Sequence, residues 1–180
     1  MATPTAPAQG TSIEVFWNTS QAAPANSGIG AATPNSQPVA VTTSGAAYIA
    51  ADVVGGIISL LTVNSATGRR VTLRTVCVKE KAGAAPALHI EFYKATPTGG
   101  PYTDNAPLVR GTTDAANRVG TLNVAAADYL TDVTETTATY SGLGMKLPVA
   151  ATTLFMLIIS QGSYTLTNGN LTINLEFDQE

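Results

Sequence analysis

Residues 171–177 have the sequence Leu-Thr-Ile-Asn-Leu-Glu-Phe, in which apolar and polar side chains alternate. Successive side chains of a β-strand point to opposite faces of the sheet. The alternation therefore predicts a strand with one face on the core and one face in water. Residues 88–93 repeat the pattern, because Leu88, Ile90 and Phe92 alternate with more polar neighbours. Both segments predict half-buried strands of an antiparallel sheet.

Two further segments are apolar on both faces, namely Val53–Val63 and Leu154–Ile159. Strands that are covered on both sides have this composition, so both segments predict central strands. Val71–Val78 is rich in β-branched residues and follows a turn sequence, which predicts another strand. The pair Gly55-Gly56 inside the first segment predicts a bulge or bend there.

Turn sequences separate these strands, and no long helix is predicted. Asn168-Gly169 favours a type I′ hairpin that joins the last two strands, because both residues tolerate a positive φ. Pro97–Pro101 contains two prolines and two glycines and predicts a loop. Without helices to cover a sheet, the strands must cover one another. The sequence therefore predicts an all-β fold, an antiparallel β-sandwich of the jelly-roll type.

The N-terminal part differs from the rest in charge. No charged residue lies between Glu14 and Asp52, and the stretch is rich in Ala, Ser, Thr and Pro. We expect residues 1–38 to form an extended arm and residues 39–180 to form the β-sandwich domain. A short apolar cluster interrupts the arm, and it either docks on another protein or forms a first strand of the main sheet. The predicted partner contacts of the arm are Ile13, Val15, Phe16 and Trp17.

Composition excludes several classes of function. The chain has 180 residues, 12% of them charged, with nine Lys plus Arg and a net charge of −3, which argues against nucleic-acid binding. One cysteine excludes an internal disulfide framework, and one histidine excludes a multi-histidine metal site. No apolar run reaches about 18 residues, so no membrane span is expected. The first ten residues also lack the basic and apolar regions of a secretory signal.

Catalytic motifs are missing, and we predict no catalytic residue, cofactor or metal. His89 and Glu91 share the polar face of a predicted strand, where they form either a general base or, more simply, a solvated pair. Asp128, Asp132 and Glu135 lie close together in sequence. They form either a calcium site with Asp104 and Asp114 of earlier loops or ordinary turns.

The cations are scattered along the chain. Arg70, Arg74 and Arg110 form either a modest patch that steers an acidic protein partner or a solvated strand face. Cys77 lies in the same strand as the first two and is expected to be a small buried apolar residue.

A family resemblance covers about residues 46–177. The segment Tyr48–Gly56, Tyr-Ile-Ala-Ala-Asp-Val-Val-Gly-Gly, resembles a Tyr-x-x-Gly-Asp-Val-x-Gly segment of small structural proteins of tailed bacteriophages. In those proteins a strand like Val71–Lys79 and a strand ending in Phe, like Leu88–Tyr93, come next. A Pro-Thr loop like Pro97-Thr98 and an Asp-Asn-Ala element like Asp104–Pro107 then follow.

Two positions depart from that pattern. Ala51 stands where the pattern has Gly, and Pro107-Leu108 stands where a Phe would be usual. The resemblance implies a virion component, a head decoration or cement protein that is made in the host cytoplasm. Such proteins bind the outside of the major capsid protein shell as oligomers and clamp neighbouring capsomers.

Two alternatives to this function remain open. One is a β-sandwich module of a phage tail, fibre or other surface that binds a host glycan or receptor. This function predicts that Tyr102 and Tyr129 converge beside Asp104 and Asp128. A more distant alternative is a carbohydrate-active enzyme, which requires paired carboxylates about 5–9 Å apart in a cleft.

Overall fold

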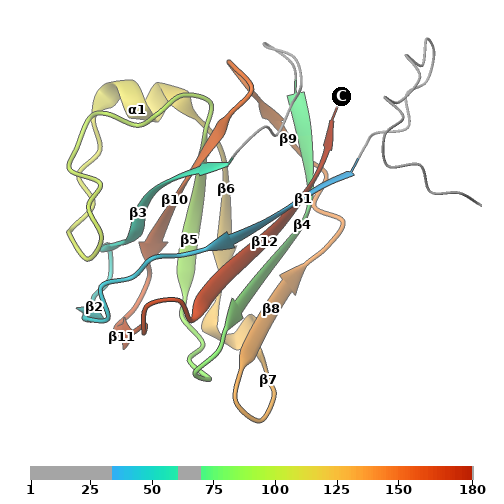
Figure 1. The fold of residues 1–180 in the computed structure, drawn as a ribbon. Helices are drawn as coiled ribbons and strands as arrows, with labels where there is room; N and C mark the ends of the chain where they lie inside the picture. Colours follow the sequence, from blue (N-terminus) through green and yellow to red (C-terminus); the bar gives the residue numbers. More distant parts are fainter. Residues whose placement is uncertain (1–33, 61–69, 180) are drawn as a thin grey trace, which may run out of the picture. The chain divides into compact units, whose positions relative to one another are not determined.

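The computed structural model describes residues 34–60 and 70–179, which form two facing antiparallel β-sheets and a short ribbon (Figure 1). No helix in this part of the chain is long and apolar enough to cross a membrane. The elements are β1 (Pro34–Ala40), β2 (Ala47–Tyr48), β3 (Val53–Leu60), β4 (Arg70–Glu80), β5 (Leu88–Tyr93), α1 (Thr112–Asn117), β6 (Arg118–Val124), a 3-10 turn (Ala126–Asp128), β7 (Leu130–Thr131), β8 (Thr136–Tyr140), β9 (Met145–Pro148), β10 (Leu154–Ser160), β11 (Tyr164–Thr165) and β12 (Leu171–Gln179).

The strand order is that of a jelly roll. The larger sheet has the order β1-β12-β4-β8-β7. Both β8 and β9 pair with the same edge of β4, β8 with its second half and β9 with its first half. The smaller sheet has the order β3-β10-β5-β6. The longer strands can be renumbered 1 to 8 in chain order, with β8 and β9 counted together as one strand. In this numbering the order is 1-8-3-6 in the larger sheet and 2-7-4-5 in the smaller sheet. This arrangement confirms the predicted all-β antiparallel sandwich of the jelly-roll type.

The main core lies between the two sheets. Leu171, Ile173, Leu175 and Phe177 of β12 are all fully buried there, as their alternation predicted. β10 is central in its sheet and buried on both faces, which confirms that prediction. β3 was expected to be central too, and this was wrong, because it ends the order of the smaller sheet. Val53 at its start packs against Tyr102 of the loop after β5, whereas Ile57 is 36% exposed.

That loop changes the outer face of the smaller sheet. β5 was predicted to have one solvated face, but Glu91 and Tyr93 on that face are fully buried. The chain after β5 returns across the sheet and packs Tyr102 against Val53, Tyr93 and neighbouring side chains of β10. This second apolar cluster explains why the expectation of a solvated face was wrong.

The glycine pair of β3 forms the predicted bulge. The pairing of β3 with β10 shifts at this point, and Gly55 and Gly56 have φ values of +77° and +74°. A side chain at Gly55 would have its Cβ 2.4 Å from Val41 Cγ1, so Val41 would have to shift to make room. Glycine is therefore favoured at position 55 by both conformation and space.

The predicted hairpin between the last two strands was wrong. A turn does form, with the Asn170 N–H bonded to the Thr167 carbonyl at 3.1 Å, but of its two central residues only Gly169 has a positive φ. β11 pairs with β2, whereas β12 pairs with β1 and β4. The segment before the turn is held by Thr43, which donates its hydroxyl to the Leu166 carbonyl at 3.0 Å.

The larger sheet begins at Pro34, so residues 34–38, which were assigned to the arm, form part of β1. The Val41 N–H donates to the Leu171 carbonyl, and amides alternate in direction along a strand. The backbone nitrogen of Pro38 therefore points to the edge of the sheet that no described strand occupies. Because proline has no N–H, this position cannot donate to an added strand, which protects the edge.

Candidate functional site

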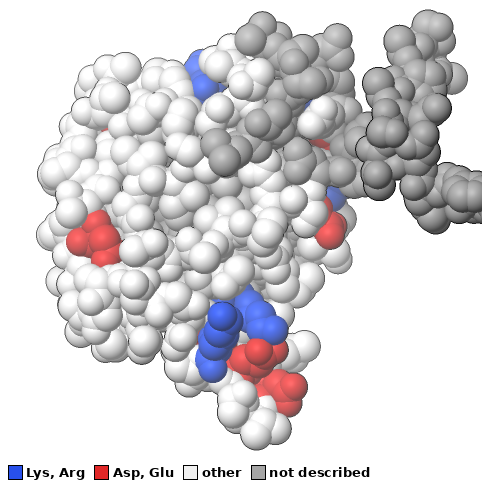
Figure 2. Space-filling model, in the orientation of Figure 1, with Lys and Arg blue, Asp and Glu red and all other residues white. Residues whose placement is uncertain are grey.

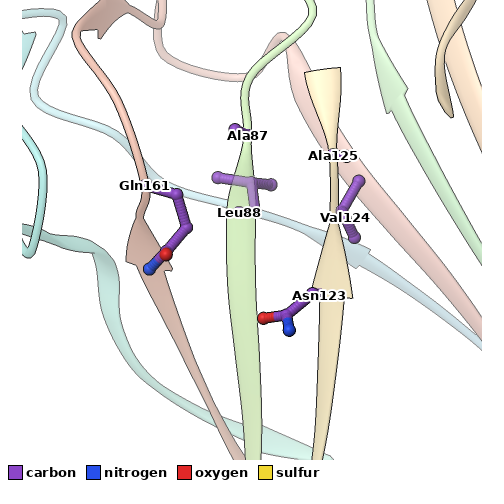
Figure 3. A pocket seen from close by; sticks show the side chains of 6 residues that line it. All are labelled: Ala87, Leu88, Asn123, Val124, Ala125 and Gln161. Carbon is purple, nitrogen blue, oxygen red and sulfur yellow. The ribbon is translucent and has the colours of Figure 1, made fainter. Parts of the chain in front are cut away.

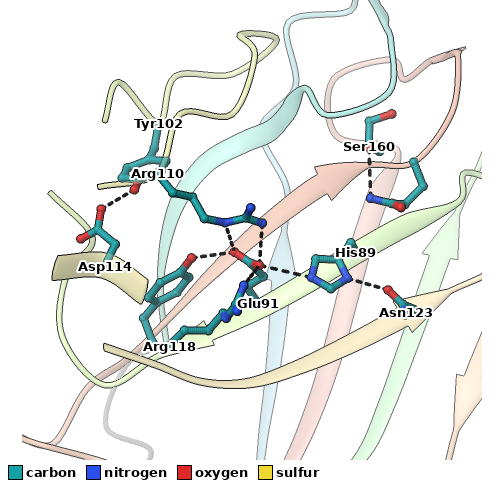
Figure 4. A network of polar contacts seen from close by, with 10 residues as sticks. His89, Glu91, Tyr102, Arg110, Asp114, Arg118, Asn123 and Ser160 are labelled. Atoms are coloured by element: carbon teal, nitrogen blue, oxygen red, sulfur yellow. Dashed lines mark hydrogen bonds and ion pairs between the residues drawn. The ribbon is translucent and has the colours of Figure 1, made fainter. Parts of the chain in front are cut away.

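The four predicted contacts of the arm, Ile13, Val15, Phe16 and Trp17, lie outside the described residues. Within the described part, the residues singled out for chemistry fall into separate groups. The most enclosed of these groups surrounds Glu91 on the outer face of the smaller sheet (Figure 4).

Glu91 is a fully buried carboxylate that accepts hydrogen bonds from three side chains and lies within hydrogen-bond distance of a fourth, His89. Its Oε1 accepts from Arg110 Nη2 at 2.7 Å and from Arg118 Nη1 at 2.7 Å. Its Oε2 accepts from the Tyr93 hydroxyl at 2.6 Å, and the His89 Nε2 lies 3.2 Å from Oε1. Figure 4 shows both arginines reaching the carboxylate from different segments. Glu91 therefore fastens the returning loop to the sheet.

The charge of this group is positive overall. Burial opposes ionisation of Glu91, but hydrogen bonds from Tyr93, Arg110 and Arg118 outweigh it and lower the pKa of the carboxyl. One carboxylate faces two guanidinium groups, whose side chains are each 38% exposed. His89 was expected to form a solvated pair with Glu91, but it lies between that carboxylate and Asn123, 2.5 Å from the amide oxygen.

Asp114 anchors the loop after β5 in a second way. It accepts hydrogen bonds from the Tyr102 hydroxyl and from the backbone N–H groups of Thr98 and Gly99, at 2.9 and 2.7 Å for the latter two. Burial first, and then this carboxylate, raise the pKa of Tyr102 to about 12. All of these contacts hold α1 against the predicted Pro97–Pro101 loop, so Asp114 has a structural role.

Asp104 binds the segment that carries the family resemblance. Its Oδ1 accepts from the Tyr48 hydroxyl at 2.7 Å and from the Gly55 N–H at 2.6 Å, and its Oδ2 accepts from the Ser44 N–H at 2.6 Å. Burial and then Asp104 raise the pKa of Tyr48 to about 12. The neighbouring Asn105 N–H donates to the Val53 carbonyl at 2.7 Å. Tyr48–Gly56 and Asp104–Pro107 thus form one hydrogen-bonded unit.

The three acids near residue 130 are not gathered on one site. Asp128 accepts from the Ala125 N–H and the Tyr140 hydroxyl, Asp132 accepts from the next N–H of its own turn, and Glu135 pairs with Lys79 at 2.7 Å. Residues 34–60 and 70–179 hold no group of three or more acidic, His or Cys side chains that suits a metal ion. Asp128 and Asp132 thus bond within their own turns, and Glu135 forms an ion pair with β4.

The other predicted groups also separate. Tyr102 lies in the outer apolar cluster and Tyr129 in the main core, so they do not converge beside Asp104 and Asp128. Arg74 pairs with Asp178 of the larger sheet, whereas Arg110 belongs to the Glu91 group, so no common patch forms. Cys77 was expected to be buried but is half-buried, because its side chain lies on the outer face of β4.

A pocket opens beside the Glu91 group, at the start of β5 and the end of β6 (Figure 3). Its volume is about 240 Å³, and most of its lining is apolar. Asn123, which contacts His89, belongs to the pocket wall as well. The pocket is lined by Ala87, Leu88, Asn123, Val124, Ala125 and Gln161.

Sequence reasoning missed this pocket and the role of Arg118. The pocket follows from small side chains at Ala87 and Ala125, which lie far apart in sequence and carry no motif. Arg118 meets Glu91 because β6 pairs with β5 and places it opposite Tyr93. Such a pairing register is not visible in the sequence before the partner strand is known.

The β7–β8 hairpin is a second exposed feature that had no assigned role. Leu130 and Val133 are 81% and 96% exposed, the highest values among the large apolar side chains of the described residues. Figure 2 shows a face that is largely free of charge, with acidic and basic side chains gathered where this hairpin projects. The hairpin therefore exposes two large apolar side chains next to charged ones.

Comparison with known proteins gives little. No family model and no curated protein matches the chain. One solved structure with some likeness is described as the EclA C-terminal domain, a sugar-binding protein. It is 13% identical, the alignment covers 97% of this chain and 100% of that chain, and the TM-score is 0.31. A TM-score this low supports no argument about the function of this chain.

Proposed function

We propose that this chain is a non-catalytic structural protein of a bacteriophage virion, a decoration or cement protein that binds the major capsid protein shell. The observation that supports this proposal best is that the acids near the loops serve as structural hydrogen-bond acceptors. Glu91, Asp104 and Asp114 each accept three or more hydrogen bonds from the fold itself. These three carboxylates thus act as structural acceptors that fasten the loops to the sheets.

The surface suits repeated contact with another protein. Figure 2 shows that charged side chains are sparse on the visible face. Contact with an uncharged face avoids the cost of removing ions from water. On a shell with many identical sites, individually weak contacts gain strength through effective concentration. Any protein that binds only the assembled shell also stabilises that assembly by mass action.

The choice of a phage shell as the partner rests on the family resemblance of residues 46–177. The glycan-binding alternative is not favoured by the described residues, because the aromatic platform it required does not form. The enzyme alternative loses support for a similar reason, since the enclosed acids serve the loops.

Co-sedimentation with purified capsids that lack this protein tests the proposal. We expect saturable binding and a higher temperature of capsid disruption when the protein is bound. The full-length variant with Ala at Ile13, Val15, Phe16 and Trp17 should keep the melting temperature of the β-sandwich and lose most of its affinity for the capsid. Absence of binding by the wild-type chain, or binding that leaves capsid disruption unchanged, would contradict the proposed function.

A further inference from the structure

The turn between β11 and β12 contains the one Asn-Gly pair of the sequence, Asn168-Gly169. Both residues are exposed to water. An added Cβ at Gly169 would have no other atom within 4 Å, so the space beside this glycine is open. Because glycine has no side chain, its backbone nitrogen is also easier to approach than that of any other residue. The side chain of Asn168 is therefore followed by an accessible peptide nitrogen.

The hydrogen bonds of the turn leave these two groups able to react with each other. The N–H of Gly169 donates to no other group within the described part of the chain, whereas the next N–H, that of Asn170, donates to the Thr167 carbonyl at 3.1 Å. The side-chain oxygen of Asn168, Oδ1, accepts from the Thr43 N–H at 3.2 Å. If the nitrogen attacks the side-chain carbonyl carbon, negative charge develops on this oxygen, and a donor aimed at it stabilises that charge.

We propose that Asn168 is a site of spontaneous deamidation in the folded protein. The Gly169 nitrogen forms a bond to Cγ of Asn168 and loses its proton, the Cγ–Nδ2 bond breaks, and ammonia leaves. The product is a cyclic imide that contains both the side-chain and the main-chain carbonyl carbon of residue 168. Water then opens the ring at one of these two carbons. Opening at Cγ gives aspartate, and opening at the main-chain carbon gives isoaspartate. Water is the only co-reactant, and no capsid is needed.

The two products differ in their effect on the turn. Both carry a carboxylate in place of the amide, so the chain gains one negative charge at neutral pH. Aspartate can still accept the hydrogen bond from the Thr43 N–H. Isoaspartate adds a methylene group to the main chain, inside the turn that the hydrogen bond from Asn170 to Thr167 closes. Isoaspartate therefore opens this turn next to Leu171, the first residue of β12, whose side chain is fully buried.

Prolonged incubation of the full chain at neutral pH, followed by peptide mass spectrometry that distinguishes aspartate from isoaspartate, tests this proposal. The mass gain of deamidation should accumulate at Asn168. Asn170 is an internal control in the same turn, because it precedes a leucine, and it should keep its amide. Gly169→Ala should slow the gain several-fold, since a Cβ hinders approach to the nitrogen. Asn168→Gln should abolish it, since the longer side chain would have to close a larger ring. Melting temperatures verify that both variants are folded.

A parallel sample in guanidinium chloride shows whether the folded turn permits the reaction. Deamidation at Asn168 in the denatured sample alone, an equal gain at Asn170, or an unchanged rate in Gly169→Ala would overturn the proposal. The Asn168→Asp variant represents the aspartate product and should melt near the wild-type temperature. Wild-type protein that has accumulated isoaspartate should melt at a lower temperature than this variant. Equal melting temperatures would contradict the opening of the turn.

Discussion

Replacement of Ala51 by glycine should stabilise the β-sandwich. Ala51 has a φ of +74°, in the left-handed region that residues with a Cβ rarely adopt. Its conformation is fixed on both sides, because its N–H donates to the Ser160 carbonyl and its carbonyl accepts from the Leu108 N–H, each at 2.9 Å. The chain therefore cannot relax at this position without losing two backbone hydrogen bonds.

The size of the gain follows from two opposing effects. A left-handed backbone costs a residue with a Cβ roughly 1–2 kcal/mol, and glycine removes this cost. Glycine also increases the conformational freedom of the unfolded chain, which lowers stability by about 0.4–1 kcal/mol. The Ala51 side chain is exposed, so little apolar burial is lost. We expect a net gain of about 0.5–1 kcal/mol, or ~1–4 °C in the melting temperature.

Urea denaturation at neutral pH, followed by circular dichroism, measures the free energy of unfolding. Ala50→Gly is the matched control, because Ala50 is also exposed and does not have a positive φ. This control should lower the free energy of unfolding, since only the unfolded-state effect of glycine remains. The reasoning fails if Ala51→Gly is no more stable than the wild type, or if Ala50→Gly gains as much.

Three other changes test single contacts. Glu91→Gln should reduce the loss of stability in acid. The pKa of the Glu91 carboxyl in the folded protein lies below its ordinary 4.5, so the carboxylate stabilises the fold above that pH. This contribution is lost as the pH falls through the folded pKa. Urea titrations from about pH 6 to pH 3 should therefore give a flatter curve for the variant, and an unchanged slope would contradict this role. Gly55→Ala should lower the free energy of unfolding by more than Gly45→Ala. Both glycines have a positive φ, but only at Gly55 would an added Cβ clash with a neighbouring side chain. Equal losses of stability in the two variants would exclude the clash. Pro38→Thr should leave the melting temperature nearly unchanged but increase light scattering at high concentration, because it returns an N–H to the open edge of β1, and scattering equal to wild type would argue against edge protection.

The sequence was sufficient for most strands because their signals are local. The alternation of residues 171–177 places every second side chain in the core, whatever the partner strands are. The glycine pair at 55–56 marked the bulge because only glycine adopts that backbone easily. The lack of long helices then left few ways to cover two sheets, and the jelly roll is one of them.

Features that depend on distant segments were not predictable in the same way. Residues 88–93 alternate as a half-solvated strand does, yet the loop that ends at α1 covers their outer face. Glu91 was therefore expected at the surface but is buried, where it binds Arg110 of the loop. Asn168-Gly169 has the composition of a hairpin turn, but Thr43 and β2 hold the chain before it in another ribbon. In each case a non-local contact outweighed a local preference.

The two segments on which the proposed resemblance rests have a structural role in this fold. Tyr48–Gly56 and Asp104–Pro107 are far apart in sequence, but Asp104 bonds both the tyrosine and the first glycine of the pair, and Asn105 bonds β3. The positive φ at Ala51, where the pattern has Gly, also reflects the folding of this unit. These residues therefore specify the scaffold, and their substitution should act through stability. Specificity for a partner must then come from positions that the scaffold leaves exposed, of which the tip at Leu130 and Val133 is the clearest.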